Sequence, residues 1–495
     1  MSSEKRKDAE SFQSSAPSWQ RERIAAGKHA RKKVPFEAQA TYRAAPHRDP
    51  LKILEEQNQE RLQDLVPLRM SRMIENPFSY FRGAAGPMAA DLSHGPFSGG
   101  RVFVCGDAHI NNFGVYAAPD GRLVFDVNDF DESTIGPWEW DLKRCVTSVF
   151  LAGTERGDDQ EEIAHCALEC ARAYRDSLKI QLDREVQDRF FDPTLAGGTP
   201  EKEPHSKRAS ARRRVIVALA NTVAAARDRT SVRAADRMTY LTHDGHGRVH
   251  DEPPVLVPLE HRDHRFTDPA FTQYQTEMPA NIALLMSEYR LTNFARRVVG
   301  VGSVGTRCYV GVFTGPGGEP LVLQLKQAVR STLVQFGKQP IPNNPILVPE
   351  RAEKTPGYRP VTCQRAIQEV TDPYLGAVEV EGLGFYVRQF RDENEGIDVV
   401  SSSLKEFRDY VRSCGAQLGR AHARSKDGAF ARGYIGSSDR FPKAVVRWAK
   451  AYAAQTNTDF EMLKKACAAG RFPVEATGEK TAAPIAAKRG KQKSK

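Results

Sequence analysis

Residues 105–142 read CGDAHINNFGVYAAPDGRLVFDVNDFDESTIGPWEWDL, and they hold most of the polar chemistry of this 495-residue chain. The run GRVFVCGD predicts a short strand that ends at Gly106, and LVFDVND predicts a second strand after a Pro-Asp-Gly turn suited to a hairpin. Beyond Gly136 and Pro137, apolar residues recur at three-and-four spacing, which predicts a helix with one buried face. A strand end, a hairpin and a helix start therefore bracket a polar segment.

Four carboxylates lie close together at the end of the second predicted strand, namely Asp126, Asp129, Asp131 and Glu132. Such crowding is repulsive unless a cation is present. Oxygen ligands without a thiolate suit a hard divalent ion. We therefore expect Asn112 and Asp129 to hold Mg²⁺, with Asp131 as a further ligand.

The segment GDAHINNFG supplies groups suited to phosphoryl transfer. Asp107 can accept the proton of an attacking hydroxyl, and Asn112 can bind a metal that bridges phosphates. His109 is a second catalytic candidate, able to position the loop or to approach the substrate. Local hydrogen bonding in a tight turn is the alternative for Asp107 or Asn112 taken alone. Asp141 is expected to support the Asp107 loop by accepting backbone N–H bonds.

A glycine-rich segment, GVGSVG at 300–305, fits the pattern G-x-G-x-x-G. The residues after it, TRCYVGVF, favour a strand rather than the helix that a dinucleotide site requires. A glycine loop between two strands suits close approach of the backbone to nucleotide phosphates. The expected binding residues are Gly300, Gly302, Ser303 and Gly305. An ordinary glycine-rich hairpin is the alternative.

Lys326 follows this loop in the apolar run LVLQLKQA. Alternation places Gln324 and Lys326 on one face of a predicted strand. A lysine is expensive to bury unpaired, and beneath a glycine loop it can bridge nucleotide phosphates. An exposed lysine on an edge strand is the alternative. Arg82 is a possible phosphate contact, although packing or a surface salt bridge is the more ordinary interpretation.

These motifs resemble those of aminoglycoside phosphotransferases and other kinase-like enzymes that act on small molecules. Gly106, Asp107, His109 and Asn112 match the first part of that motif, and Cys105 stands where a histidine is usual. The later parts of the motif are matched, in order, by Asp129-Phe130-Asp131, Gly136-Pro137 and Asp141-Leu142. The resemblance implies a kinase-like fold, ATP and Mg²⁺.

Over about residues 50–465 the chain is identified as a member of the bacterial family called domain of unknown function 2252. The segments that carry this identification are FRGAAGPMAADL, CGDAHINNFG, FDVNDFDES, GPWEWDLKR, VVGVGSVGTRC and LQLKQA. In ordinary kinases the glycine loop and its lysine precede the catalytic Asp, whereas here both follow it. The resemblance therefore implies circular permutation. Glu350, Glu353 and Glu369 are the candidates for the glutamate that usually pairs with the lysine.

The expected fold is α+β, with a small β-rich nucleotide lobe inserted between segments of a mainly helical lobe. A helix is expected around 284–297, before the strands begin. The expected divisions are a disordered basic arm at 1–50, a helical catalytic lobe with an acidic hairpin at 51–275, a β-rich nucleotide-binding lobe at 276–395, a helical return at 396–470, and a disordered basic tail at 471–495.

Composition narrows the possible partners. The net charge of +10 comes from the ends, because residues 1–50 carry +5 and residues 480–495 carry +6. Such tails can touch nucleic acid, but we expect no specific contact. No stretch is apolar enough to span a membrane. The polar N-terminus and eight scattered cysteines, which are expected to be reduced thiols, predict a cytoplasmic location.

The function expected from these features is ATP- and Mg²⁺-dependent phosphoryl transfer to a hydroxyl of an unidentified small molecule. Nucleotidyl transfer by the same groups is a near relative. A nucleotide-binding pseudokinase without turnover is one alternative, because no glutamate partner for Lys326 is evident. A metal-dependent phosphoester hydrolase that uses the acidic cluster alone is another.

Overall fold

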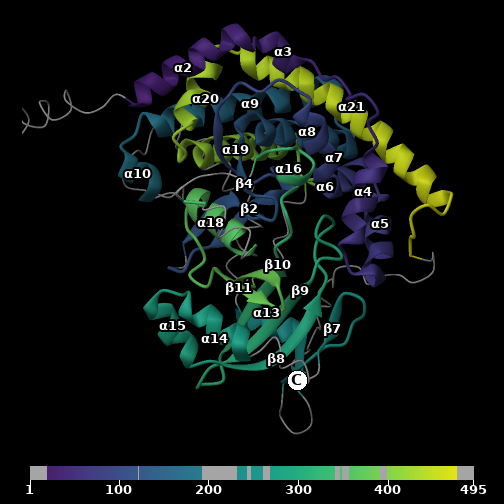
Figure 1. The fold of residues 1–495 in the computed structure, drawn as a ribbon, viewed down its shortest axis with the longest axis vertical. Helices are drawn as coiled ribbons and strands as arrows, with labels where there is room; N and C mark the ends of the chain where they lie inside the picture. Colours follow the sequence, from purple (N-terminus) through teal and green to yellow (C-terminus); the bar gives the residue numbers. More distant parts are fainter. Residues whose placement is uncertain are drawn as a thin grey trace, which may run out of the picture.

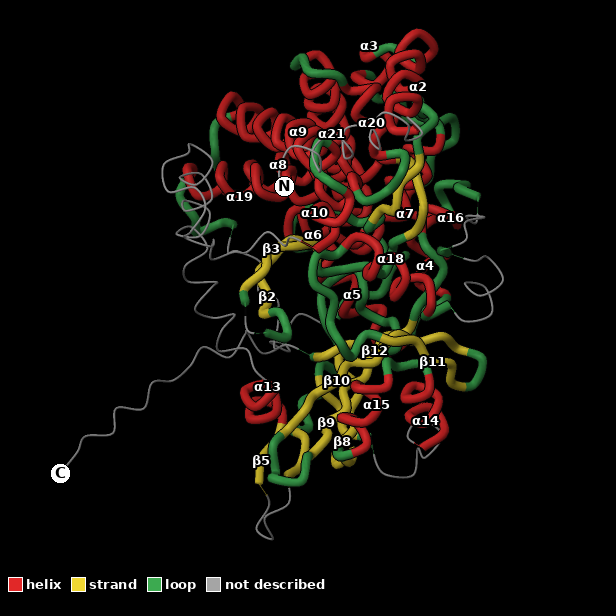
Figure 2. Tube along the Cα trace, turned by 90° about the vertical axis from the view of Figure 1, so that its left-hand side faces the viewer, coloured by secondary structure: helices red, strands yellow, loops and turns green. Residues whose placement is uncertain are grey.

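The computed structural model separates into a mainly helical lobe and a lobe built on one sheet, which lie at opposite ends of the long axis (Figure 1). Figure 2 shows the same division, with most helices above and the sheet strands below. The residues that the structure describes are 19–120, 122–191, 231–241, 247–259, 268–340, 346–347, 356–390 and 399–475. The predicted α+β class is confirmed, and no helix in these ranges is long and apolar enough to cross a membrane.

The helical lobe is assembled from both ends of the chain. Its N-terminal helices are α2 (Trp19–Lys33), α3 (Phe36–Ala40), α4 (Pro50–Gln59), α5 (Val66–Met73), α6 (Pro77–Gly83), α7 (Ala85–Ser93), α8 (Trp138–Arg156), α9 (Gln160–Leu182) and α10 (Val186–Phe191), with the short 3₁₀ turns η1 (Gln63–Leu65) and η2 (Ile110–Asn112). Its C-terminal helices are α19 (Leu404–Ala423), α20 (Gly428–Ile435) and α21 (Arg440–Ala468).

Local sequence signals set the ends of the central helices. The Asp159 side chain accepts the backbone N–H of Glu161 at the start of α9. Ser403 and Glu406 form a reciprocal capping box at the start of α19. The apolar faces of α8, α9 and α19 then pack together in one large core.

The second lobe is a six-stranded antiparallel sheet in the order β11-β12-β10-β9-β8-β7. The strands are β7 (Leu256–Pro258), β8 (Arg290–Arg297), β9 (Cys308–Thr314), β10 (Pro320–Gln327), β11 (Gly376–Val380) and β12 (Leu383–Gln389). The helices α14 (Asp268–Thr276) and α15 (Ala280–Ser287) lie at one side of this sheet (Figure 1). A further helix, α13 (Ser231–Met238), packs on the sheet beside the hairpin of β5 (Thr239–Leu241) and β6 (Gly247–Val249).

The acidic stretch forms two small antiparallel pairs on the helical lobe. The predicted hairpin is present as β2 (Phe113–Ala117) with β3 (Leu123–Val127). The predicted first strand, β1 (Arg101–Val104), pairs with β4 (Thr134–Pro137), which leads directly into α8. The helix α18 (Tyr358–Ile367) lies between the lobes, whereas α16 (Thr332–Gln335) packs against α7 in the helical lobe (Figure 1). Cys363 and Ile367 of α18 join the large helical core, whereas Val361 packs with Tyr386 of the sheet.

Two expectations about the chain's organisation are wrong. The helix expected around 284–297 ends at Ser287, and residues 290–297 form β8, because this segment pairs with β9. Residues 19–40 are not a disordered arm but two helices, and α2 packs so closely on α20 that a side chain at Gly27 would overlap the carbonyl of Phe430. Residues 1–18 and 476–495 lie outside the described residues.

The sheet lobe also begins earlier than residue 276. Ala234 and Met238 of α13 are buried against Val310 and Val322, so this helix belongs to the sheet and not to the helical lobe. The strand β7, at 256–258, is an edge of the same sheet. The sequence 231–275 lacks long apolar runs, so its pattern does not indicate which lobe it joins. Its packing against the strands of the sheet decides this.

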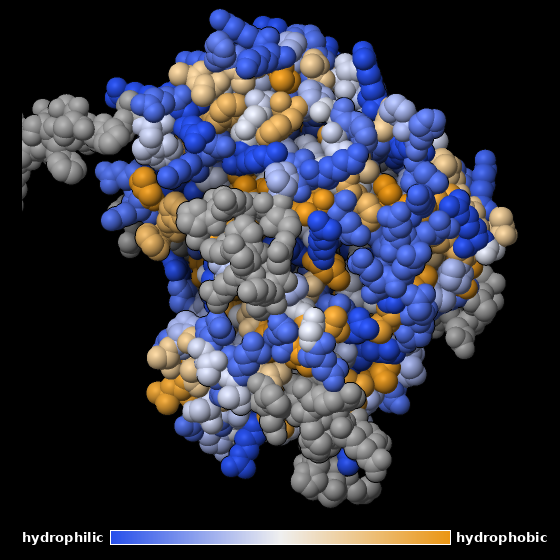
Figure 3. All heavy atoms as spheres, in the orientation of Figure 1, coloured by the Kyte–Doolittle hydropathy of each residue, from blue (hydrophilic) through white to orange (hydrophobic). Residues whose placement is uncertain are grey.

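The surface of the sheet lobe carries one apolar helix. Leu284 is 70% exposed and Leu285 is 38% exposed. Figure 3 shows hydrophobic atoms at the place that α15 occupies in Figure 1. Elsewhere the eight cysteines are all free thiols and all buried.

Candidate functional site

Lys326 joins the two lobes electrostatically. It lies on β10 with only 2% of its surface exposed, and its Nζ forms an ion pair with the Asp131 carboxylate. Asp129 Oδ1 lies 3.8 Å from the same Nζ. The hydroxyl of Tyr386 donates to the second oxygen of Asp131 at 2.5 Å. The lysine of the later sheet thus contacts two acids of the earlier segment.

The protonation states in this contact are strongly fixed. Burial alone would raise the pKa of Asp131, but Lys326 and the Tyr386 hydroxyl hold it below the usual value. Burial would likewise lower the pKa of Lys326, and the charges of Asp129 and Asp131 raise it instead. The lysine is therefore a cation and Asp131 an anion at neutral pH.

A cavity of about 390 Å³ opens beside this ion pair. Five of the residues predicted from the sequence line it, namely Asn112, Asp129, Gly300, Ser303 and Lys326. The other lining residues are Arg82, Asn111, Tyr116, Asn128, Val299, Gln324, Gln364, Gln368, Asp372, Arg388, Gln389 and Phe390. The cavity is thus shared between the glycine loop, the sheet and the acidic stretch.

The glycine-rich loop connects β8 to β9, two antiparallel neighbours in the sheet. Gly300 and Gly305 have φ values of 70° and 88°, in the left-handed region that glycine adopts easily. Gly302 and Gly305 are not among the residues that line the cavity. Ser303 lines the cavity, and its hydroxyl donates to the Val299 carbonyl at 2.8 Å.

Helical-lobe residues hold this loop. Arg72 donates to the Gly300 carbonyl at 2.5 Å, and the Leu62 N–H donates to the Gly305 carbonyl at 2.8 Å. Arg61 donates to the carbonyl of Val304. The loop is therefore fastened to the segment between α4 and α5, which the sequence did not predict.

Asp107 lies in the turn after β1, where its own backbone carbonyl organises the segment. That carbonyl accepts the Asn112 side-chain amide at 2.7 Å and the His109 backbone N–H at 2.8 Å. The Asp107 carboxylate forms an ion pair with Arg144 of α8. Burial raises the pKa of Asp107, and Arg144 opposes that rise. Asp107 is 17% exposed at its side chain but does not line the cavity.

His109 is buried beneath the same turn. Its Nε2 lies 3.8 Å from Asp107 Oδ2, and its Nδ1 is buried without a hydrogen-bond partner. Burial lowers the pKa of His109 far below 6.5, and the charges of Arg82 and Arg144 act in the same direction. The imidazole is therefore neutral at physiological pH and packs edge-on to Phe78.

Asp141 lies in the first turn of α8 and braces the Asp107 turn. Its carboxylate accepts the backbone N–H groups of Cys105 at 2.9 Å and Gly106 at 3.0 Å. His422 of α19 approaches it to 3.4 Å and contacts the Tyr174 hydroxyl on its other side at 2.8 Å. His422, which comes from a helix distant in the sequence, thus contacts the turn. In the motif of this turn Cys105 stands where a histidine is usual.

The four carboxylates of the acidic stretch do not form one cluster, because neighbouring positions point in different directions. Asp126 is fully buried and accepts the Glu369 backbone N–H at 2.6 Å and the Gln417 amide at 2.7 Å. Glu132 accepts the backbone N–H of Thr332 at 2.6 Å. Asp126 and Glu132 are therefore satisfied by their own donors, whereas Asp129 and Asp131 face the Lys326 ammonium group.

The glutamates considered as partners of Lys326 do not take that place. Glu369 forms an ion pair with Arg420 at 2.6 Å, and Glu350 and Glu353 lie outside the described residues. Asp131 is the close partner of the lysine. Because both oxygens of Asp131 are engaged, metal ligation by Asp131 would compete with its contacts to Lys326 and Tyr386.

Sequence reasoning missed the contribution of β12. In the sheet register, Tyr386 lies opposite Lys326 and Arg388 lies opposite Gln324. Arg388 donates to the Gln324 amide oxygen at 2.8 Å and to the Asn128 carbonyl at 3.1 Å. The signal was the period of two in GFYVRQ, but the pairing register was needed to read it.

The oxygen atoms that line the cavity suit a small hard cation only if a bound phosphate supplies further oxygen ligands. Within the part of the chain that is described, no three His, Cys, Asp or Glu side chains are grouped to hold a metal. Oxygen donors are nevertheless present in Asp129 and in Asn111, whose buried Oδ1 has no hydrogen-bond partner. Mg²⁺ commonly binds one or two carboxylates plus substrate phosphates, so these residues fit it.

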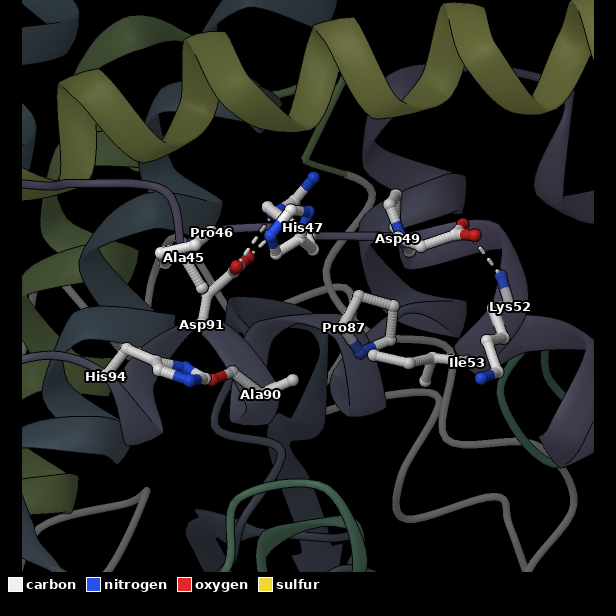
Figure 4. A pocket seen from close by; sticks show the side chains of 12 residues that line it. Ala45, Pro46, His47, Asp49, Lys52, Ile53, Pro87, Ala90, Asp91 and His94 are labelled. Atoms are coloured by element: carbon white, nitrogen blue, oxygen red, sulfur yellow. Dashed lines mark hydrogen bonds and ion pairs between the residues drawn. The ribbon is translucent and has the colours of Figure 1, made fainter.

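A second cavity, of about 220 Å³, lies between residues 45–53 and α7 (Figure 4). Its central cation is already neutralised, because Arg48 binds Asp91 at 2.7 Å and Asp459 at 2.5 Å. Asp49 accepts the backbone N–H of Lys52, as the dashed line in Figure 4 shows. We find no catalytic arrangement among the residues that line it.

Comparison with known proteins gives one match. The family described as "Uncharacterized protein conserved in bacteria (DUF2252)" matches residues 61–466. No curated protein and no solved structure matches the chain.

Proposed function

Since the chain belongs to the bacterial DUF2252 family, whose description assigns no reaction, we propose from its own residues that it is an ATP- and Mg²⁺-dependent phosphotransferase acting on a hydroxyl of a small molecule. One observation carries the proposal. Lys326 contacts Asp131 while it shares a single cavity with Asn112, Asp129 and the loop at 300–305.

The arrangement of β8, the glycine loop, β9 and β10 supports nucleotide binding. Consecutive antiparallel strands place the loop and the lysine on neighbouring strands, with Lys326 opposite Cys308 at the start of β9. A loop that turns at Gly300 leaves room for phosphate oxygens, and the ammonium group provides the charge that binds them. A two-lobed, circularly permuted kinase-like fold is part of the proposal.

The residues of the helical lobe would act on the acceptor and the metal. Asp107 would orient the acceptor hydroxyl and take its proton, with Arg144 and Asp141 fixing the turn. Asn112 and Asp129 would hold Mg²⁺, with Asn111 as a further oxygen donor. When bound, Mg²⁺ would neutralise charge on the phosphates.

Isothermal titration with ATP, with and without Mg²⁺, tests the proposal. We expect the wild type to bind ATP more tightly with Mg²⁺, and Lys326→Met to lose at least tenfold in affinity. Lys52→Met is the matched control because Lys52 is exposed and lines the second cavity, not the one that Lys326 lines. Equal affinity in wild type and Lys326→Met, with both proteins folded by circular dichroism, would contradict the role of the lysine.

A nucleotide-binding protein without turnover is the second candidate, favoured by the ion pairs that already engage Asp107 and Lys326. ADP release from ATP in the presence of cell extract separates the two candidates. Release that disappears in Asp107→Asn supports the phosphotransferase. ATP binding without any release, in wild type and variant alike, supports the second candidate.

A further inference from the structure

We infer that Arg82 binds the terminal phosphate of the nucleotide, so that a guanidinium from the helical lobe and the ammonium of Lys326 hold the polyphosphate from two sides. This inference rests on the proposed function and names a binding residue within it. Arg82 lies in the last turn of α6 and lines the same cavity as Gly300, Ser303 and Lys326.

Backbone geometry places Arg82 next to the glycine loop. A methyl group added at Gly302 would lie 3.1 Å from the Arg82 carbonyl oxygen. The loop therefore rests on the chain at Arg82, while the Arg82 side chain reaches the cavity that the loop borders. Lys326 reaches the same cavity from β10.

Arg82 differs from the arginines around it because, within the described ranges, its guanidinium donates to no acceptor. Arg72 donates to Gly300, Arg144 binds Asp107, and Arg388 donates to Gln324. Among the described residues, Arg82 makes no hydrogen bond or ion pair, and its Nε is buried without an acceptor. The surface salt bridge expected as the ordinary interpretation of Arg82 is therefore not formed.

An unpaired, partly buried cation is unfavourable, so an anion that enters the cavity gains a partner whose desolvation is already largely complete. Burial lowers the pKa of Arg82, and the negative charges of Asp107, Glu75 and Asp129 act against that. Asp129, which is assigned to the metal, lines the same cavity as Arg82. We therefore place the transferred phosphate at the end of the cavity that these two residues share.

The chemistry of guanidinium suits this position. Its planar fork donates two parallel hydrogen bonds to a phosphate, which an ammonium group cannot do. Lys326 is already paired with Asp131, whereas Arg82 lines the cavity with its buried Nε lacking an acceptor.

Titration of a nucleotide series tests the inference. With Mg²⁺ present, ATP, ADP, AMP and inorganic tripolyphosphate are titrated into wild type, Arg82→Lys, Arg82→Met and the remote control Arg440→Ala, whose side chain is 70% exposed. We expect Arg82→Met to weaken ATP and tripolyphosphate at least tenfold and AMP less than twofold. Arg82→Lys should fall between, because it keeps the charge and loses the fork.

Thermal melting provides the second readout, because a structural role and a binding role predict opposite results. Removal of an unpaired cation should leave the melting temperature of Arg82→Met equal to or above that of the wild type. A large fall in melting temperature, or an equal loss of affinity for AMP and ATP, would overturn the inference.

The two proposals fail in distinguishable ways. Suppose that wild type binds tripolyphosphate but not ATP, and that Arg82→Met loses the tripolyphosphate binding. That result would exclude nucleotide chemistry and confirm that Arg82 binds anions. If wild type binds ATP and Arg82→Met binds it equally well, the proposed function stands and the role of Arg82 is wrong. If wild type binds neither ATP nor tripolyphosphate, both are wrong.

Discussion

Lys326 and Asp131, roughly two hundred residues apart in the chain, form a buried ion pair between the sheet lobe and the helical lobe. The contact has a third member in Tyr386, whose hydroxyl is 2.5 Å from the carboxylate. Two lobes that share a buried ion pair are coupled in stability as well as in any chemistry at their boundary.

Asp131→Asn should lower the free energy of unfolding by about 3 kcal/mol, because it leaves the Lys326 ammonium buried with only the more distant Asp129 as counter-charge. The double variant Lys326→Met/Asp131→Asn should cost less than the sum of the single variants. Urea unfolding followed by circular dichroism measures all four proteins. Additive effects would mean that the pair contributes no coupling.

Gly106→Ala should destabilise the protein by about 3 kcal/mol, because two costs combine. Gly106 has a φ of 80°, and a methyl group there would overlap the Glu132 carbonyl. Gly157→Ala is the matched control, since Gly157 has a φ of 79° but nothing within 4 Å of the added carbon. The control should cost about 1 kcal/mol in the same urea experiment. Equal losses in the two variants would show that packing against Glu132 is unimportant.

Lys143→Met should raise the free energy of unfolding at pH 7. Burial lowers the pKa of Lys143 to about 8, from 10.5 when solvated, and the side chain lies over the Trp448 ring. As pH rises, Lys143 loses its proton in the folded state before it does so in the unfolded state. The buried charge therefore lowers the free energy of unfolding by its full amount below pH 8, and this loss shrinks to zero as pH rises to 10.5.

The gain from Lys143→Met should therefore shrink by about 3 kcal/mol between pH 7 and pH 11, measured by urea unfolding at each pH. Lys179→Met is the control, because the Lys179 side chain is 58% exposed. A gain that does not vary with pH would mean that the pKa of Lys143 is the same in the folded and unfolded states.

Arg72→Ala should loosen the glycine loop without unfolding either lobe. It removes the donor to the Gly300 carbonyl, a contact that is worth about 1 kcal/mol when exposed to solvent. Amide hydrogen exchange followed by mass spectrometry should speed up about fivefold to tenfold in the loop 299–305 and stay unchanged in α9. Arg440→Ala provides the baseline, and unaltered exchange in the loop would show that Arg72 does not hold it.

The sequence predicted the parts of the site that depend on local pattern. The hairpin of β2 and β3, the strand that carries Lys326 and the turn at Asp107 all follow from alternation, turn residues and glycine positions. Asn112, Asp129 and Lys326, which these segments carry, line one cavity.

The sequence could not predict features that depend on which distant segments pair. Arg144 neutralises Asp107, and Tyr386 reaches Asp131 only through the register of β12 against β10. Basic composition at 1–50 indicated a disordered arm, yet α2 is ordered because it packs on α20. The helix expected through 297 is not formed because six residues of RLTNFARR pair with β9.

The contact between α9 and α19 has a consequence for synthesis. A side chain at Gly415 would overlap the Cys170 carbonyl, so the two helices touch backbone to backbone. Because α19 leaves the ribosome more than two hundred residues after α9, the nascent chain carries the apolar faces of α8 and α9 uncovered for much of translation. A chaperone that shelters them until residue 423 has emerged would suit this order of assembly.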